Sequence, residues 1–124
     1  MKKVILSKTA PPPIGPYSQA IEANGFVFCS GQIPLDAAGQ VVPGDVKAHT
    51  EQIMKNIEAV LTAAGIGFKN VVKTNIFLTS MSDFATVNEI YGKYFPENPP
   101  ARSTIQVAGL PKGVSVEIEV TAIK

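Results

Sequence analysis

The last segment of the chain, residues 114–123, alternates strictly between two kinds of side chain. Every second residue is apolar: Val114, Val116, Ile118, Val120 and Ala122. The residues between them are mostly polar or charged. Because successive side chains of a β-strand point to opposite faces of the sheet, this pattern predicts a strand with one buried and one open face. Other elements of the chain must then cover the apolar face.

Two segments have the spacing of helices that can supply this cover. Residues 45–65 carry an apolar stripe at helical spacing, with Asp45 as a favourable N-cap and Gly65 placed to end the helix. Residues 83–95 carry a second apolar stripe, which Pro96 stops. Two helices can cover only one face of a sheet of five or six strands.

The remaining regular segments predict further strands. Residues 17–22 and 26–30 flank Asn24-Gly25, the strongest short-range signal for a β-hairpin. Residues 71–79 are rich in β-branched side chains, and residues 102–107 form another strand candidate. A hairpin followed by strand–helix pairs predicts an α+β domain with a mixed sheet.

Residues 102–107 also alternate in polarity. We expect the polar residues of this segment, Arg102, Thr104 and Gln106, to lie on the uncovered face together with the polar set of residues 114–123. That face is then polar on two strands.

The same uncovered face must carry apolar side chains elsewhere. Phe26 and Phe28 alternate with Val27 and Cys29, so both faces of this strand are apolar. A half-apolar sheet face is unfavourable in contact with water. We therefore expect an oligomer that closes this face.

The rare residues limit the chemistry of the chain. It has one Arg, one His and one Cys among 124 residues, with a formal net charge of +1. One Cys and one His cannot form a Cys/His zinc site or an internal disulfide. The thinly spread lysines give no basic stripe for nucleic acid, and no apolar run approaches the roughly 18 residues of a membrane span. We expect one domain over residues 1–124, with the cytoplasm as the default location.

Two residues stand out as candidates for chemistry. Arg102 presents a planar guanidinium suited to bidentate carboxylate recognition, although a surface or interface ion pair is the structural alternative. Glu117 lies mid-strand on the polar face, where a carboxylate is costly unless it is functional or paired with a Lys or with Arg102. His49 is expected at a helix edge, and Cys29 as a small core residue.

Several motifs of the chain resemble those of one known family. They are Ile14-Gly15-Pro16-Tyr17-Ser18-Gln19, Ser30-Gly31-Gln32-Ile33-Pro34, Asp83-Phe84-Ala85-Thr86-Val87-Asn88, Pro100-Ala101-Arg102-Ser103, Leu110-Pro111 and Val116-Glu117-Ile118. Their spacing is compatible with the family from residue 10 to the C-terminus. The chain thus resembles the Rid family, the reactive intermediate imine/enamine deaminases, also called the YjgF or endoribonuclease L-PSP family.

The resemblance implies a chorismate-mutase-like α+β fold, with a mixed sheet and two helices on one face. It implies a homotrimer whose ligand clefts lie between subunits. The implied reaction is hydrolysis of 2-imino acids to 2-keto acids and ammonia, without a cofactor in this protein. Such imines arise from enamines of the 2-aminoacrylate type, which pyridoxal-phosphate-dependent dehydratases release, so the implied role is control of metabolite damage.

The resemblance also assigns roles to residues of this chain. Arg102 would hold the substrate carboxylate, and Glu117 would orient water and move protons to the leaving nitrogen. The implied substrate-binding residues are Tyr17 from a neighbouring subunit, Ser30, Gly31, Asn88 and Thr104. Two positions depart from the best-characterised branch of the family, where Thr104 is commonly Cys and Gly109 is often Arg.

Two other functions remain open at the level of sequence. A regulatory trimer could bind small carboxylates in the same cleft without turnover. An endoribonuclease is the activity in the older family name. Near-neutral charge with one Arg and one His makes a poor nuclease site, so we rank that activity last.

Overall fold

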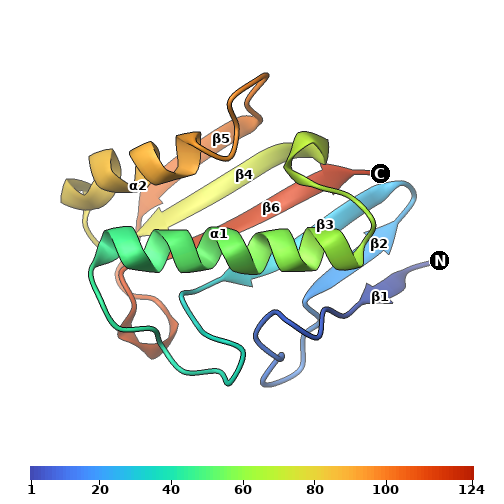
Figure 1. Ribbon diagram of the computed structural model, residues 1–124, viewed down its shortest axis with the longest axis horizontal. Helices are drawn as coiled ribbons and strands as arrows, with labels where there is room; N and C mark the ends of the chain where they lie inside the picture. The colour runs from blue at the N-terminus through green and yellow to red at the C-terminus, as the bar shows by residue number, and fades with distance from the viewer.

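A six-stranded sheet forms the frame of the molecule in a computed structural model that describes residues 1–124 (Figure 1). Its strands are β1 (Lys3–Ile5), β2 (Ala20–Ala23), β3 (Phe26–Gln32), β4 (Val71–Leu78), β5 (Ala101–Gln106) and β6 (Val116–Ile123). They lie in the order β1-β2-β3-β6-β4-β5. The strictly alternating strand β6 lies inside the sheet and is antiparallel to both β3 and β4. Because β4 and β5 pair in parallel, the sheet is mixed, as predicted.

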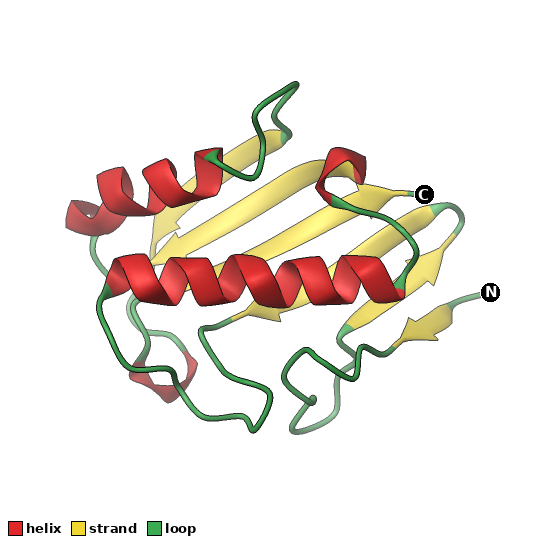
Figure 2. Ribbon diagram, viewed as in Figure 1, coloured by secondary structure: helices red, strands yellow, loops and turns green.

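Two helices, α1 (Val46–Ala63) and α2 (Phe84–Gly92), pack on the same face of this sheet (Figure 2). The Asp45 side chain caps α1 by accepting a hydrogen bond from the Ala48 N–H, and Gly65 follows the helix with a φ of +80°. Both predicted ends of this helix are therefore confirmed. Neither helix combines the length and the apolarity needed to cross a membrane.

The second helix is shorter than the predicted span of residues 83–95. Its α-helical part ends at Gly92, and the next turn tightens, with the Phe95 N–H donating to the carbonyl of Gly92 three residues earlier. Pro96 disfavours helical backbone at the residue before it, which explains the early end. At the other end, Asp83 belongs to a short 3₁₀ turn, Met81–Asp83, that leads into α2.

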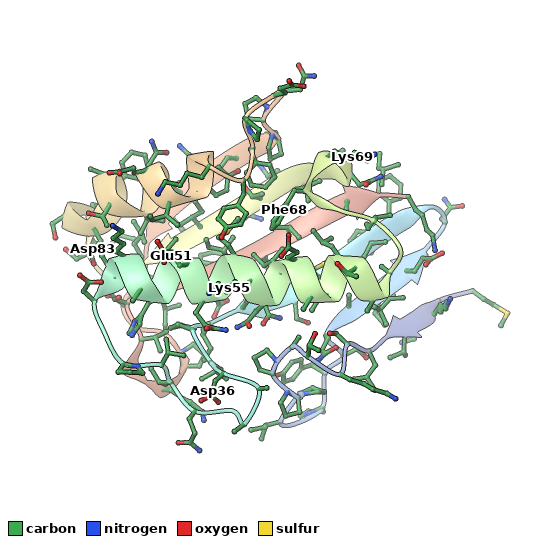
Figure 3. The ribbon with its side chains drawn as sticks, in the orientation of Figure 1. Asp36, Glu51, Lys55, Phe68, Lys69 and Asp83 are labelled. Carbon is green, nitrogen blue, oxygen red and sulfur yellow. The ribbon has the colours of Figure 1, made fainter.

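The core lies between the sheet and α1. All five apolar residues of the alternating segment are buried: Val114, Val116, Ile118, Val120 and Ala122. All of them except Val114 belong to one core cluster with the apolar face of α1, where Ile53, Ile57 and Val60 are buried. Glu51 and Lys55 belong to the part of α1 that points away from the sheet (Figure 3). The predicted amphipathic pairing of strand and helix is confirmed.

Phe68 fills the space between the two helices over the sheet (Figure 3). Its ring centroid lies 5.1 Å from that of Tyr94 and 5.5 Å from that of Phe95. These offset and edge-on arrangements are the favourable ones for aromatic pairs. The aromatic side chains after α2 are therefore largely packing residues.

The hairpin prediction is also confirmed. Asn24 and Gly25 have φ values of 53° and 82° between β2 and β3, which is the left-handed backbone that a two-residue type I′ turn requires. Strand β1, in contrast, was not predicted. Three residues are too few to show an alternating pattern, and β1 is recognisable only through its pairing with β2.

The sheet face opposite the helices is half apolar, as predicted. Phe28 is 49% exposed and Ile123 is 44% exposed on this face, and the ring of Phe26 stacks 5.8 Å from that of Phe28. Glu117 and Glu119 lie on the same face of the neighbouring strand β6. This face, called the open face below, thus combines aromatic rings with two carboxylates.

Candidate functional site

Arg102 lies on the helix side of the sheet. It is the register partner of Thr74 on β4, and Thr74, Ile76 and Leu78 are all buried under the helices. Thr104 pairs with Ile76 in the same register. The expectation that Arg102, Thr104 and Gln106 lie on the uncovered face is therefore wrong.

The physical reason is the edge position of β5. Strand β5 is the last strand of the sheet, beside the short helix α2, so its helix side is only partly covered. Polar side chains are tolerated there because they reach water at the rim of the sheet. Polarity on β5 therefore marks the edge of the sheet and not its open face.

The guanidinium of Arg102 is held by α2. Its Nη1 donates to Oδ1 of Asn88 at 2.6 Å, and its Cζ lies 5.5 Å from the ring centroid of Phe84 and 5.1 Å from that of Tyr91. No carboxylate neutralises it, since the one ion pair of the chain joins Lys124 to Glu22 at 3.2 Å. An ion pair within the chain, the structural alternative for Arg102, is absent. The uncompensated positive charge is suited to an anionic ligand.

A hollow of about 440 Å³ opens beside this guanidinium. It is lined by Asn88, Tyr91, Gly92, Phe95, Pro99, Pro100 and Arg102. Two residues further along β5, the hydroxyl of Thr104 is buried and has no hydrogen-bond partner. Arg102, Asn88 and Thr104 together are called the arginine group below.

Glu117 belongs to the other side of the sheet. It pairs with Phe77 on the open face and lies against Gly31, where the register between β3 and β6 shifts. A Cβ atom at residue 31 would collide with the Glu117 carboxylate. The missing side chain of Gly31 therefore lets the carboxylate approach the backbone of β3 closely.

The electrostatic environment of Glu117 favours its protonated form. Burial raises the pKa of the Glu117 carboxyl, and the negative charge of Glu119 raises it further. A carboxylate with a raised pKa is a stronger base than an exposed glutamate. Glu117 is thus suited to accept and return a proton.

Glu117, Gly31 and Tyr17 line a second hollow, of about 360 Å³, and are called the glutamate group below. Tyr17 was predicted to come from a neighbouring subunit, and here it lines the hollow of its own chain. Ser30 lies next to Gly31, and its hydroxyl donates to the carbonyl of Ser18 at 2.6 Å.

The predicted site residues therefore form two groups on opposite faces of one sheet. Arg102 and Glu117 do not share a hollow within a single chain. Sequence reasoning missed Tyr91 and Phe84 beside Arg102, because both belong to the apolar stripe of α2 and look like core residues. It also missed Lys112, which lines the Glu117 hollow and donates from Nζ to the Gly39 carbonyl at 3.1 Å.

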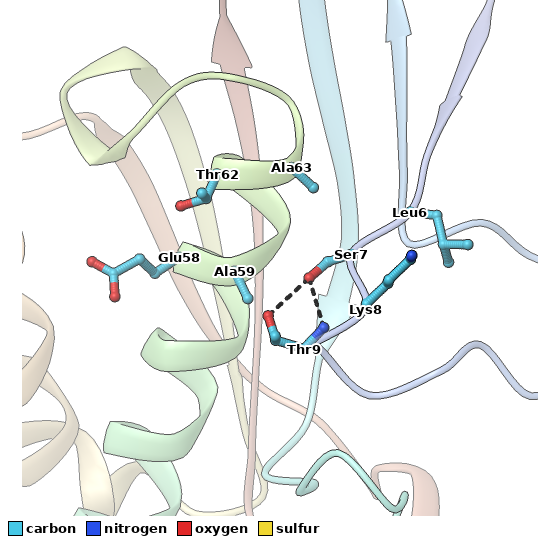
Figure 4. A pocket seen from close by; sticks show the side chains of 8 residues that line it. All are labelled: Leu6, Ser7, Lys8, Thr9, Glu58, Ala59, Thr62 and Ala63. Atoms are coloured by element: carbon cyan, nitrogen blue, oxygen red, sulfur yellow. Dashed lines mark hydrogen bonds between the residues drawn. The ribbon is translucent and has the colours of Figure 1, made fainter.

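Another hollow contains none of the predicted site residues. It measures about 560 Å³ and lies between the chain after β1 and the C-terminal half of α1 (Figure 4). Ser7 and Thr9 form hydrogen bonds with each other at its edge, and Glu58 and Thr62 approach from the helix. It offers no guanidinium, since the single arginine of the chain lines another hollow.

His49 and Cys29 have structural environments. The His49 ring lies on α1, with Nε2 2.8 Å from the carbonyl of Val42 in the preceding loop. Burial raises the pKa of the Cys29 thiol to about 12, which keeps it protonated and unreactive. No group of three or more His, Cys, Asp or Glu side chains that could hold a metal ion is present.

The protein is an α+β domain with one mixed sheet, two helices on one face of it, and hollows large enough for small molecules. The family model described as Endoribonuclease L-PSP matches residues 7–124. A RutC family protein of Pyrococcus horikoshii is 50% identical over 125 residues, which cover 100% of this chain and 99% of that protein. The 2-iminobutanoate/2-iminopropanoate deaminase of Mus musculus is 50% identical and covers 100% of this chain and 93% of its own length.

A solved structure shows the same relationship in three dimensions. The structure of a protein of the conserved Rid protein family from Yersinia pestis superposes with a TM-score of 0.97 at 49% identity, covering 100% of both chains. The chain belongs to the Rid family, as its motifs predicted.

The raised pKa of Glu117 leads to a prediction about stability. In the folded chain this carboxyl holds its proton more tightly than in the unfolded chain, so ionisation weakens folding as the pH rises through its pKa. We expect Glu117→Gln to raise the Tm at pH 7 and to lose this advantage at a pH low enough to protonate glutamate in both states. Thermal unfolding across this pH range measures the effect.

The exposed Glu89 on α2 offers a matched control, and Glu89→Gln is expected to leave the Tm nearly unchanged at every pH. A Tm of Glu117→Gln at or below that of the wild type at pH 7 would contradict the prediction.

Proposed function

We propose that this chain hydrolyses 2-imino acids to 2-keto acids and ammonia. The observation that carries the proposal is the Arg102 guanidinium, which is held in place by Asn88 and has no carboxylate partner. Relatives from mouse, rat and human, 49–50% identical to this chain, are named 2-iminobutanoate/2-iminopropanoate deaminase. Other relatives carry RutC or endoribonuclease names. A small 2-imino acid has the single carboxylate that such a guanidinium recognises.

Arg102 would bind the substrate through the donors that Asn88 leaves free. Only Nη1 donates within the chain, so Nε and Nη2 remain for two parallel hydrogen bonds to a carboxylate. Asn88 would line the cleft, and the backbone of Thr104 would accept a hydrogen bond from the imine nitrogen. Holding the carboxylate fixes the position of the neighbouring C=N bond.

Glu117 would act as the proton carrier. The substrate reacts as the imine protonated on nitrogen. The carboxylate removes a proton from water as the water oxygen bonds to the imine carbon, and a tetrahedral amino alcohol forms. Glu117 then returns this proton to the nitrogen, the C–N bond breaks as the keto group forms, and the hydroxyl proton passes to the Glu117 carboxylate and from there to solvent. Ammonia leaves, and no redox step or cofactor is required. Ser30 and Gly31 would contact the reacting end of the substrate.

The two groups of residues can meet only between copies of the chain. We propose a homotrimer in which the arginine group of one copy faces the glutamate group of the next. The half-apolar open face, with Phe28 and Ile123, supports such an assembly because it needs cover. Tyr17, 52% exposed beside Glu117, would then close a cleft that a neighbouring Arg102 completes. We place this reaction in the cytoplasm, beside dehydratases that release enamines.

The direct test couples a Ser/Thr dehydratase to this protein and follows the release of keto acid. The wild type is expected to accelerate release, and Arg102→Ala to lower kcat/KM by about 10- to 100-fold, since hydrogen bonds to charged groups contribute roughly 1.5–3 kcal/mol. Lys55→Ala, which removes an exposed positive charge from α1, is the matched control and is expected to keep full activity.

Three outcomes separate the candidate functions. No acceleration by the wild type, together with saturable binding of a keto acid, would identify a binding or regulatory protein. Full activity of Arg102→Ala would refute the assigned role of this residue. Ribonuclease activity that survives both Arg102→Ala and Glu117→Ala would come from another site or another protein.

The pH profile tests the role of Glu117 separately. A base must be ionised, so kcat/KM is expected to fall as the pH drops through the raised pKa of Glu117. Glu119→Gln removes the neighbouring charge that contributes to this raised pKa, so the acid limb is expected to move to lower pH. The amide can still accept the hydrogen bond that Asn75 donates to Glu119 at 2.9 Å. An acid limb that stays in place, or moves to higher pH, would argue against Glu117 as the base.

Sedimentation analysis tests the assembly. The wild type is expected to sediment as a trimer, and Phe28→Glu, which places a charge on the open face, to yield smaller species with little activity. Thr62→Glu adds the same charge to an exposed position of α1, on the other side of the sheet, and is expected to leave both properties unchanged. A wild type that is monomeric and fully active would refute the shared cleft.

A further inference from the structure

We propose that Tyr91, supported by Thr74 and Phe84, positions the Arg102 guanidinium before substrate binds. Tyr91 belongs to the apolar stripe of α2 and looks like a core residue from its spacing alone. The inference rests on the proposed role of Arg102 in binding the substrate carboxylate. It adds a set of residues that hold the Arg102 guanidinium in place. This set is called the cradle below and consists of Phe84, Tyr91 and Thr74.

The two aromatic residues of the cradle and Asn88 form one face of α2. Phe84, Asn88 and Tyr91 follow one another at positions i, i+4 and i+7, which lie on the same side of a helix. All three contact the guanidinium: Asn88 through a hydrogen bond of 2.6 Å, and the two rings with their centroids 5.5 and 5.1 Å from Cζ. Both ring distances lie within the range of about 6 Å in which a cation is attracted to an aromatic face.

Tyr91 is itself fixed by the sheet. Its hydroxyl lies 2.8 Å from Oγ1 of Thr74, and both side chains are buried. Thr74 is the register partner of Arg102 in the parallel pair of β4 and β5. Arg102 on β5 therefore lies opposite Thr74 on β4, and Thr74 is the residue that hydrogen-bonds the Tyr91 hydroxyl. Because a buried hydroxyl without a partner is costly, this hydrogen bond resists rotation of the ring.

The charge state of Tyr91 agrees with this role. Burial raises the pKa of the Tyr91 hydroxyl, against the smaller opposing effects of the Thr74 hydrogen bond and of the Arg102 charge. The phenol therefore stays neutral beside the guanidinium, and Arg102 keeps its full positive charge for a ligand. A phenolate in this place would compete with the substrate carboxylate.

The cradle explains how a long, flexible side chain can serve as a clamp. Asn88 engages Nη1, and the two rings restrict the plane of the guanidinium, while Nε and Nη2 remain free on one edge. An arginine that is ordered beforehand loses less conformational freedom when a carboxylate binds. Loss of the cradle should therefore weaken binding more than it slows the chemical step.

The single arginine of the chain makes the test unusually direct. Its Nε–Hε group gives one arginine signal in a nitrogen–proton NMR spectrum of the intact assembly, with no overlap from other arginines. The experiment records this signal for the wild type, Tyr91→Leu and Tyr91→Phe, and measures the binding of 2-oxobutanoate to each. Tyr94→Leu is the matched control, because its ring meets Phe68 and does not contact Arg102.

The proposal predicts a displaced and narrowed Arg102 signal in Tyr91→Leu, because the ring no longer shields or restrains it. The Kd for 2-oxobutanoate should rise roughly three- to tenfold, as expected for one lost cation–aromatic contact. In the dehydratase-coupled assay KM should rise by a similar factor, with kcat changed less than about twofold. Tyr91→Phe, which keeps the ring, should restore most of the binding, and Tyr94→Leu should match the wild type in signal and binding.

An unchanged Arg102 signal in Tyr91→Leu, or a shifted signal with unchanged binding of 2-oxobutanoate, would overturn the proposal. If Tyr91→Leu does not fold, Phe84→Leu at the half-buried start of α2 serves instead, with the same two readouts and the same criteria. The wild type could lack deaminase activity while Tyr91→Leu still changes the Arg102 signal and the binding of 2-oxobutanoate. That outcome would refute the proposed function but support the role of the cradle.

Discussion

Burial of one row of side chains on β6 under α1 determines the position of nearly everything else. Val116, Ile118 and Val120 are fixed in the core because their burial removes apolar surface from water. Since a strand alternates strictly, Glu117 is then forced to the opposite face. A one-residue slip of β6 would place Glu117 in the core and Ile118 in its hollow. The same interaction that stabilises the fold therefore also fixes the register of the proposed proton carrier.

A second constraint is that the two proposed catalytic residues lie on opposite faces of the sheet. Arg102 on β5 and Glu117 on β6 point to opposite faces of one sheet, and β4 lies between their strands. The proposed reaction would therefore need two copies of the chain. The proposed assembly would account for both the half-apolar open face and the divided site.

Local rules account for most of the fold that the sequence predicted. The cap at Asp45, the turn at Asn24-Gly25 and the alternation of β6 each depend on a few neighbouring residues, so a sequence pattern shows them. The errors concern segments whose structure depends on their position in the sheet. Strand β1 exists only through its neighbour, and the polar residues of β5 face the helix side because β5 lies at the edge. The motifs singled out Arg102 and Glu117 as residues of one site, which stays a prediction, whereas the contact of Tyr91 with Arg102 depends on how α2 crosses β5. No spacing rule within one element contains that information.

The contact between Gly31 and Glu117 has a consequence for sequence change over evolutionary time. There is no space between the backbone of β3 and the carboxylate for even one additional carbon atom. A methyl group at residue 31 would therefore displace the Glu117 carboxylate from the backbone of β3. The two positions, 86 residues apart in the chain, are thus coupled through this contact, and a shorter acid such as aspartate at residue 117 would relieve it.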